Sequence, residues 1–325
     1  PRPVPYCFDL GSGDLQPLGY SYVYVDETAL RDGLVKDYPV VWDTGTWIMD
    51  PETVAGLRKY VEAGGTLVTL QETGRHTTLK RDAWPIAELT GFKVKGIRPM
   101  EGTLSILTQQ PLFRKLAGKV YYNRGTSIDY SDYNYADKCV ALEPVARDTQ
   151  AIARYQDGEI AIGMRKLGKG RVIVLGSPFW RDSYDKGGMW WPGEKQNEFL
   201  EDLLAGLGLK PLATADTHKV WREHYLALNG TEEFLFLHNP YDESVTFSTE
   251  WEAVHPVGKL FDPKNGQEIP GAIDGRKVKL NQLTLTPRET LIVATQPKKA
   301  PAMVTIIRKD EIKKAYRKLA IKYHP

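Results

Sequence analysis

The sequence predicts an α/β domain, then a small β-sandwich and then a basic helix at the C-terminus. Between residues 21 and 180, short runs of β-branched and aromatic residues alternate with helical stretches, which is typical of a mostly parallel sheet covered by helices. After residue 211 the helical signals stop and short alternating strands recur. A length of 325 residues is about twice that of a typical domain. The predicted domains are 1–213, 214–297 and 298–325.

The composition is that of a globular chain, with 42% hydrophobic and 26% charged residues. Its apolar runs are far shorter than the roughly 20 residues that a membrane span needs. Cys7 and Cys139 have no CxxC spacing, so we expect neither a disulfide framework nor a metal site, and no motif indicates a cofactor. The first residues show no apolar signal region and are typical of a start inside a longer sequence. We therefore expect a soluble protein, with the cytoplasm favoured as its location.

The formal net charge of +2 hides an uneven distribution. Residues 298–325 carry +7, so the first 297 residues carry −5. An acidic body with a basic tail argues against binding of nucleic acid by the body and makes the tail a separate object.

The first domain begins with predicted strands at 22–25 and 38–42. Asp50 stands at an N-cap position, Pro51 at the first helical position, and a glycine pair follows fourteen residues later, so the segment between is predicted as a helix. A buried strand at 66–70 follows. Together these segments form one strand, crossover helix and parallel strand.

Between about 96 and 160 the pattern changes to antiparallel strands and loops. Residues 151–155 and 159–164 flank a Gln-Asp-Gly turn and predict a hairpin. The apolar run 171–175 predicts a strand covered on both faces, and 197–207 is the last predicted helix of the first domain.

Six short strands separated by turn residues make up the predicted sandwich. They span 221–228, 233–238, 245–251, 258–261, 278–285 and 290–295. Residues 296–301 have the composition of a linker.

Three segments of the first domain resemble a known family. They are Tyr-Pro-Val-Val-Trp at 38–42, Leu-Arg-Lys-Tyr-Val-Glu-Ala-Gly-Gly-Thr-Leu-Val at 57–68, and Leu-Gly-Lys-Gly-Arg-Val-Ile-Val-Leu-Gly-Ser at 167–177. The likeness covers about 18–208 and is to the trimerisation domain of glycoside hydrolase family 42 β-galactosidases. That resemblance implies a flavodoxin-like, class I glutamine-amidotransferase-like sheet with helices on both faces. The β-sandwich is similar to C-terminal domains of many glycosidases.

The resemblance implies that the catalytic barrel lies outside this chain. An active amidotransferase would need a nucleophile on a sharp turn after a strand, and the turn at 71–76 contains no Cys. Glu72 and His76 in that turn form a possible acid/base pair, although a polar loop at a strand end offers such pairs by chance. We therefore predict no catalytic residue in this chain. The alternative is a hydrolase that uses Glu72, His76 or Asp182.

Two aromatic loops follow predicted strands, where ligands of open α/β sheets usually bind. Indole faces stack on sugar C–H surfaces while charged groups bind hydroxyls, so a carbohydrate contact is one interpretation. Packing at a subunit interface is the other, and it is favoured because aromatic residues also dominate interfaces. The candidate residues are Trp42, Asp43, Trp47, Trp180, Arg181, Asp182, Tyr184, Trp190 and Trp191.

The last sixteen residues, 310–325, predict a basic amphipathic helix. They closely resemble helix II of the J domain of Hsp70 co-chaperones, which leads into a His-Pro-Asp loop. The chain ends at Pro325, before the Asp of that motif, and residues 301–307 do not resemble the family's helix I. The resemblance implies an Hsp70 contact through Lys313, Lys314, Arg317, Lys318, Lys322, His324 and Pro325.

The leading functional hypothesis is a non-catalytic region that supports and oligomerises a β-galactosidase-like glycoside hydrolase. The alternatives are a fragment of a J-domain protein and an uncharacterised hydrolase. The expected partners are further copies of the chain, a carbohydrate ligand, and Hsp70 through the tail, with no nucleic acid and no membrane.

Overall fold

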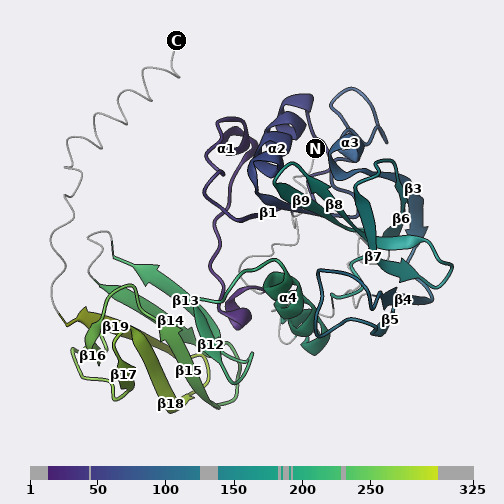
Figure 1. Ribbon diagram of the computed structural model, residues 1–325. Helices are drawn as coiled ribbons and strands as arrows, with labels where there is room; N and C mark the ends of the chain where they lie inside the picture. The colour runs from purple at the N-terminus through teal and green to yellow at the C-terminus, as the bar shows by residue number, and fades with distance from the viewer. Residues whose placement is uncertain are drawn as a thin grey trace. The chain divides into compact units, whose positions relative to one another are not determined.

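The computed structural model describes residues 14–43, 45–124, 138–181, 184–185, 190–191, 193–227 and 232–298 (Figure 1). These residues divide into two compact units. Unit 1 holds the described residues up to Lys210 apart from 16–21, and unit 2 holds 16–21 together with the described residues from Pro211 onward.

Unit 1 is built on a nine-stranded sheet in the order β1-β2-β9-β8-β7-β4-β5, with β6 branching from β8 and pairing with β3. Only the β1–β2 and β2–β9 pairs are parallel. Two further short strands, β10 (Tyr184–Asp185) and β11 (Trp190–Trp191), pair with each other. The nine strands of the sheet are β1 (Val40–Trp42), β2 (Thr66–Leu70), β3 (Phe92–Pro99), β4 (Thr103–Ile106), β5 (Val120–Tyr122), β6 (Lys138–Pro144), β7 (Thr149–Tyr155), β8 (Ile160–Leu167) and β9 (Gly170–Leu175).

Four α-helices accompany this sheet in the described part of unit 1. They are α1 (Glu27–Arg31), α2 (Pro51–Ala63), α3 (Ala87–Thr90) and α4 (Glu194–Gly206). Helix α2 packs against β2 and β9 (Figure 1). Its ends confirm the prediction, because Pro51 is its first residue and Gly64 ends it with φ of 128°, a conformation that suits glycine.

The predicted flavodoxin-like, amidotransferase-like sheet with helices on both faces is wrong. Three strands of the nine-stranded sheet, β1, β2 and β9, make its parallel pairs, and all other pairs in it are antiparallel. Antiparallel neighbours need only short turns, whereas each parallel pair needs a crossover connection, usually a helix. Among the residues described between β3 and β8, the strands therefore follow one another without a helix between them (Figure 1).

The predicted strand at 22–25 is also absent. Residues 22–25 pair with no strand and lead directly into α1, whose N-cap residue Asp26 accepts a hydrogen bond from the backbone N–H of Ala29 at 2.8 Å. The predicted basic helix at 310–325 lies outside the described residues.

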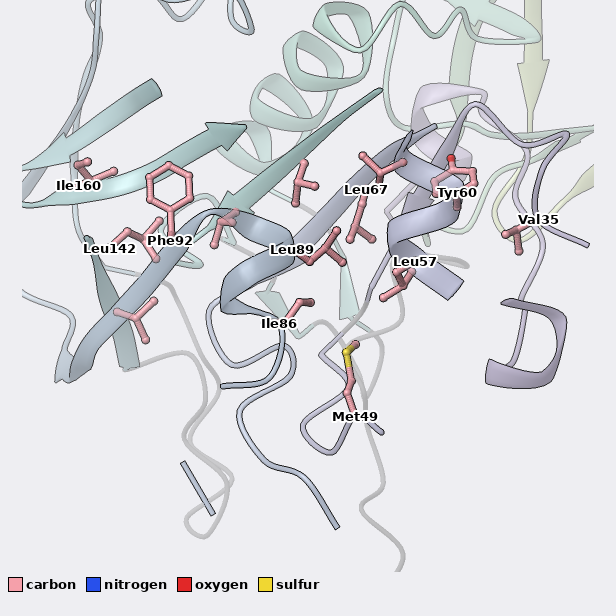
Figure 2. Packing of buried hydrophobic residues seen from close by; sticks show 14 residues of the cluster. Val35, Met49, Leu57, Tyr60, Leu67, Ile86, Leu89, Phe92, Leu142 and Ile160 are labelled. Atoms are coloured by element: carbon pink, nitrogen blue, oxygen red, sulfur yellow. The ribbon is translucent and has the colours of Figure 1, made fainter. Parts of the chain in front are cut away.

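One core cluster of unit 1 lies between α2, α3 and the sheet, as Figure 2 shows. Leu57 and Tyr60 of α2 face Leu67 of β2, and Leu89 of α3 lies in the same cluster near Phe92. Burial of such side chains supplies the main stabilising free energy of the unit.

Unit 2 contains two four-stranded antiparallel sheets, ordered β12-β15-β18-β17 and β13-β14-β19-β16, together with the short 3-10 helix η1 (Gln16–Leu18). Along β15 buried and exposed residues alternate, which places one face of the strand inward. Inward residues of both sheets, among them Leu235, Phe247 and Val293, form one hydrophobic cluster. The strands are β12 (Ala213–Ala215), β13 (Trp221–Leu226), β14 (Glu233–His238), β15 (Val245–Glu252), β16 (Val257–Phe261), β17 (Ala272–Asp274), β18 (Lys277–Leu285) and β19 (Thr290–Pro297).

Among the described residues, no helix combines the length and the apolar character that crossing a membrane requires.

Candidate functional site

The parallel strands β1, β2 and β9 end at one edge of the sheet of unit 1, and the loops after them bring several predicted residues together. We call this set the strand-end region. It consists of Trp42, Asp43, Trp47, Glu72, Arg75, His76, Trp180 and Arg181.

Asp43 fixes the backbone of the loops at this edge. Its Oδ1 accepts hydrogen bonds from the backbone N–H groups of Gly45 and Thr46, both at 2.9 Å. It also accepts one from the hydroxyl of Thr73, at 2.7 Å, in the loop after β2. Three donors on one carboxylate oxygen are typical of a loop-forming Asp. Asp43 therefore joins the β1 and β2 loops.

Glu72 and His76 make separate contacts. The buried carboxylate of Glu72 lies 2.7 Å from Nη1 of Arg75, whose Nε lies 2.5 Å from Asp82. The hydrogen bond from Arg75 is the main cause of the lowered pKa of Asp82. Nδ1 of His76 accepts a hydrogen bond from the backbone N–H of Asp82 at 2.9 Å, and its ring meets that of Trp47 edge-on at 6.3 Å. Among the described residues, no hydrogen bond joins Glu72 to His76, and each is held by another partner, Arg75 for Glu72 and the backbone of Asp82 for His76.

Trp180 is buried completely and its ring is surrounded by protein groups. It stacks on Phe199 of α4 with centroids 5.2 Å apart and an interplanar angle of 9°. Trp42 meets it edge-on at 6.4 Å, and the guanidinium of Arg181 lies 5.1 Å from its centroid. Burial lowers the pKa of Arg181 to about 10, against the opposing charge of Asp14. The strand ends thus bring Trp42 and Trp180 together, but in packing rather than on an open sugar-binding face.

The other predicted residues of the second aromatic loop are only partly placed. Asp182 lies outside the described residues. The backbones of Tyr184, Trp190 and Trp191 lie in the β10–β11 ladder, where Tyr184 pairs with Trp191. The predicted Hsp70-contact residues, Lys313 to Pro325, also lie outside the described residues, and that contact stays a prediction.

Three buried side chains, those of Ser177, Asn123 and Cys139, are joined by hydrogen bonds that the sequence did not predict. The hydroxyl of Ser177 donates to Oδ1 of Asn123 at 2.7 Å, and Nδ2 of Asn123 lies 3.6 Å from Sγ of Cys139. Burial raises the pKa of the Cys139 thiol, which disfavours the reactive thiolate. Cys139 is therefore a packed thiol, while Cys7 lies outside the described residues.

An open groove lies where β4 begins and β5 ends, at the opposite end of the β4–β5 pair from the loop that connects the two strands. Its volume is about 440 Å³. The side chain of Tyr122 on its wall is 81% exposed. The adjacent Tyr121 and Tyr122 are the signal in the sequence that could have pointed to it. The lining residues are Met100, Glu101, Gly102, Tyr122, Asn123 and Arg124.

Metal binding has no support in the described part of the chain, because no group of three or more His, Cys, Asp or Glu side chains there is arranged to hold an ion.

No known protein family matches the sequence. No curated protein matches it either.

Solved structures of glycoside hydrolases share the fold of the chain. Gan42B, a GH42 β-galactosidase from G. stearothermophilus, matches 82% of this chain with 33% of its own, at 16% identity and a TM-score of 0.55. The β-galactosidase from Rahnella sp. R3 matches 87% of this chain with 35% of its own, at 15% identity and a TM-score of 0.60. The α-L-fucosidase isoenzyme 2 from Paenibacillus thiaminolyticus matches 88% of this chain with 44% of its own, at 13% identity and a TM-score of 0.55.

The chain thus spans about a third of the length of these β-galactosidases. At such low identity the likeness shows the fold alone. The chain has the fold of a part of these GH42 β-galactosidases.

Proposed function

We propose that this chain is a non-catalytic part of a β-galactosidase-like glycoside hydrolase, and that unit 1 contributes to contact between subunits. The observation that carries the proposal is the fold likeness, which extends over 82% and 87% of this chain but only 33% and 35% of the two β-galactosidases. A region of that extent leaves room for a separate catalytic domain in the whole protein.

The hydrogen bonds and packing of the strand-end region support a non-catalytic role. A retaining glycosidase needs two carboxyl groups about 5 Å apart at a cleft, one kept protonated and one ionised. Here the carboxylate of Asp43 is held by loop donors, and that of Glu72 by Arg75. Both groups thus serve the loops, and the face of Trp180 is taken by Phe199.

The surface near β1 supports the subunit contact. Among the residues that the structure describes, β1 stands first in the sheet order and pairs with β2 alone, so it is an edge strand of this sheet. Large apolar side chains on either side of it along the chain are exposed, including Leu34 at 65% and Ile48 at 53%. Exposed apolar residues that flank an edge strand in the sequence support an interaction surface in this part of unit 1.

The assembly is tested by sedimentation of the purified chain. We expect a species larger than the 36.7 kDa of one chain, and we expect Leu34→Asp with Ile48→Asp to weaken association at least tenfold. Val120→Asp is the matched control, because Val120 is 61% exposed but lies in β5, at the other end of the sheet order. A monomer at all concentrations would contradict the proposed contact.

The non-catalytic role is tested by assaying the same chain on nitrophenyl galactosides and fucosides. We expect no turnover above the background of the buffer. Hydrolysis that is lost in Glu72→Gln would overturn this part of the proposal and favour the hydrolase alternative.

A further inference from the structure

We propose that the groove at the end of the β4–β5 hairpin binds a neutral pyranose sugar, with the ring of Tyr122 as its stacking surface. The volume of about 440 Å³ lies in the range of small-molecule sites, which is about 300–1,000 Å³. The choice of a sugar over other neutral ring compounds rests on the proposed function.

The hairpin that forms the groove is held in place on several sides. Thr103 pairs with Tyr122 in the β4–β5 ladder, and β4 also pairs with β7. The backbone N–H of Asn123 donates to the carbonyl oxygen of Gly102 at 3.0 Å. Gly102 has φ of 69°, and a Cβ there would lie 2.9 Å from Oε1 of Gln156. The backbone of the wall is therefore fixed before any ligand arrives, which lowers part of the ordering cost of binding.

The aromatic wall suits one face of a sugar ring. Tyr122 is 81% exposed, so its ring is open to solvent rather than packed in the core. An exposed aromatic face gains stability when an apolar C–H surface covers it. A pyranose has such a surface and carries its hydroxyl groups around the rim, where polar side chains reach them.

The polar groups of the groove favour a ligand without net charge. The carboxylate of Glu101 accepts hydrogen bonds and the guanidinium of Arg124 donates them, so the two match hydroxyl groups, which do both. Their charges are opposite, so an ionised ligand gains from one and is repelled by the other. Lys195 is not a lining residue, but its ammonium donates to the backbone carbonyl of Arg124 at 3.3 Å and adds a positive charge near the groove, so a charged sugar is the probe that tests the preference for a neutral one.

The side chain of Asn123, which also lines the groove, already has hydrogen-bond partners within the protein. The buried side chain of Asn123 accepts from Ser177 and donates to the carbonyl oxygen of Glu101 at 3.3 Å. Because its hydrogen bonds are already made, this side chain stabilises the structure of the groove and is not expected to bind the ligand. The residues left to bind the ligand are Tyr122, Glu101 and Arg124.

The experiment is calorimetric titration of the full chain with methyl β-galactoside, with fucose and with galacturonate as the charged probe. We expect saturable binding of a neutral sugar, weakened at least tenfold in Tyr122→Ala and retained in Tyr122→Phe, which keeps the ring. Tyr24→Ala is the control, because Tyr24 is an exposed tyrosine at another place in unit 1. Circular dichroism shows whether each variant keeps its fold.

Three outcomes would overturn the proposal. They are no saturable binding of either neutral sugar, equal affinity in Tyr122→Ala, and tenfold tighter binding of galacturonate, which would mean that charge rather than the ring selects the ligand. A chain that assembles and lacks hydrolysis but binds no sugar would refute this site while leaving the proposed function intact.

Discussion

Trp180 is packed between Phe199 and Trp42, so its removal leaves a large cavity at the strand ends. We expect Trp180→Ala to lower the free energy of unfolding by about 3–5 kcal/mol, as for other buried aromatic residues. Trp47→Ala is the control, because Trp47 is only half-buried and its ring meets His76 edge-on. Urea unfolding measures both variants, and equal losses would contradict the packing role of Trp180.

His238 makes the stability of unit 2 depend on pH. Burial lowers its pKa below the usual 6.5, the charge of Arg288 acts in the same direction, and a backbone hydrogen bond at Glu289 acts against it. As the pH falls through 6.5, the unfolded chain takes up a proton at this site that the folded chain resists, so the free energy of unfolding falls. We expect His238→Gln to flatten this decline between pH 7 and 5.5 in thermal unfolding. An unchanged slope would contradict it.

The sequence predicts where some of these residues lie along the chain, but not which of them become buried. Trp42 ends one strand that the sequence predicts and Trp180 follows another, and this is enough to place them at one edge. The burial of Trp180 depends on Phe199, which arrives from α4 and is its neighbour only in the folded chain. The groove at Tyr122 was missed for the same reason, since β4 and β5 form it through long-range pairing.

At the scale of elements, α4 is joined to the loop after β4 by one buried carboxylate. Oδ2 of Asp202 accepts hydrogen bonds from the backbone N–H groups of Arg114 at 3.0 Å and Leu116 at 2.9 Å. We expect Asp202→Asn to lower the free energy of unfolding by about 1–3 kcal/mol, because the amide must either turn its oxygen or leave these donors without partners.

Its neighbour Glu201 provides a matched control on the same helix. Glu201 pairs with Lys115 at 3.0 Å, but both side chains are largely exposed. Exposed ion pairs contribute about 0–1 kcal/mol, so we expect little change in Glu201→Gln. Similar losses in the two variants, measured by chemical unfolding, would contradict the distinction.

Elements with local signals were the predictable ones. α2 carries Pro51 at its start and Gly64 after its end, and β9 carries a continuous apolar run. The antiparallel strands gave weaker signals, because irregular register in β3–β6 and β7–β8 breaks the alternation of apolar residues. The fold class was wrong because it took the one crossover unit at 38–70 as the frame of the domain, although antiparallel strands were predicted between about 96 and 160. Strand partners far apart in sequence decide the topology.

At the scale of the whole molecule, the charge is divided between body and tail. Residues 298–325 carry +7 and the rest −5. We expect the full chain to bind a cation exchanger at pH 7 through the tail, and a chain ending at residue 297 to bind an anion exchanger instead. Elution of both at the same salt concentration from the same resin would contradict this separation.

Strand β9 is the place where the parallel and antiparallel parts of the sheet meet, with β2 on one side and β8 on the other. Its residues Val172 to Leu175 are buried. Hydrogen bonds to both neighbours shield its amide hydrogens, so their exchange with deuterium requires opening of the surrounding sheet. The slowest amides of β9 would therefore report the global stability of unit 1, while those of the edge strands β1 and β5 report local opening.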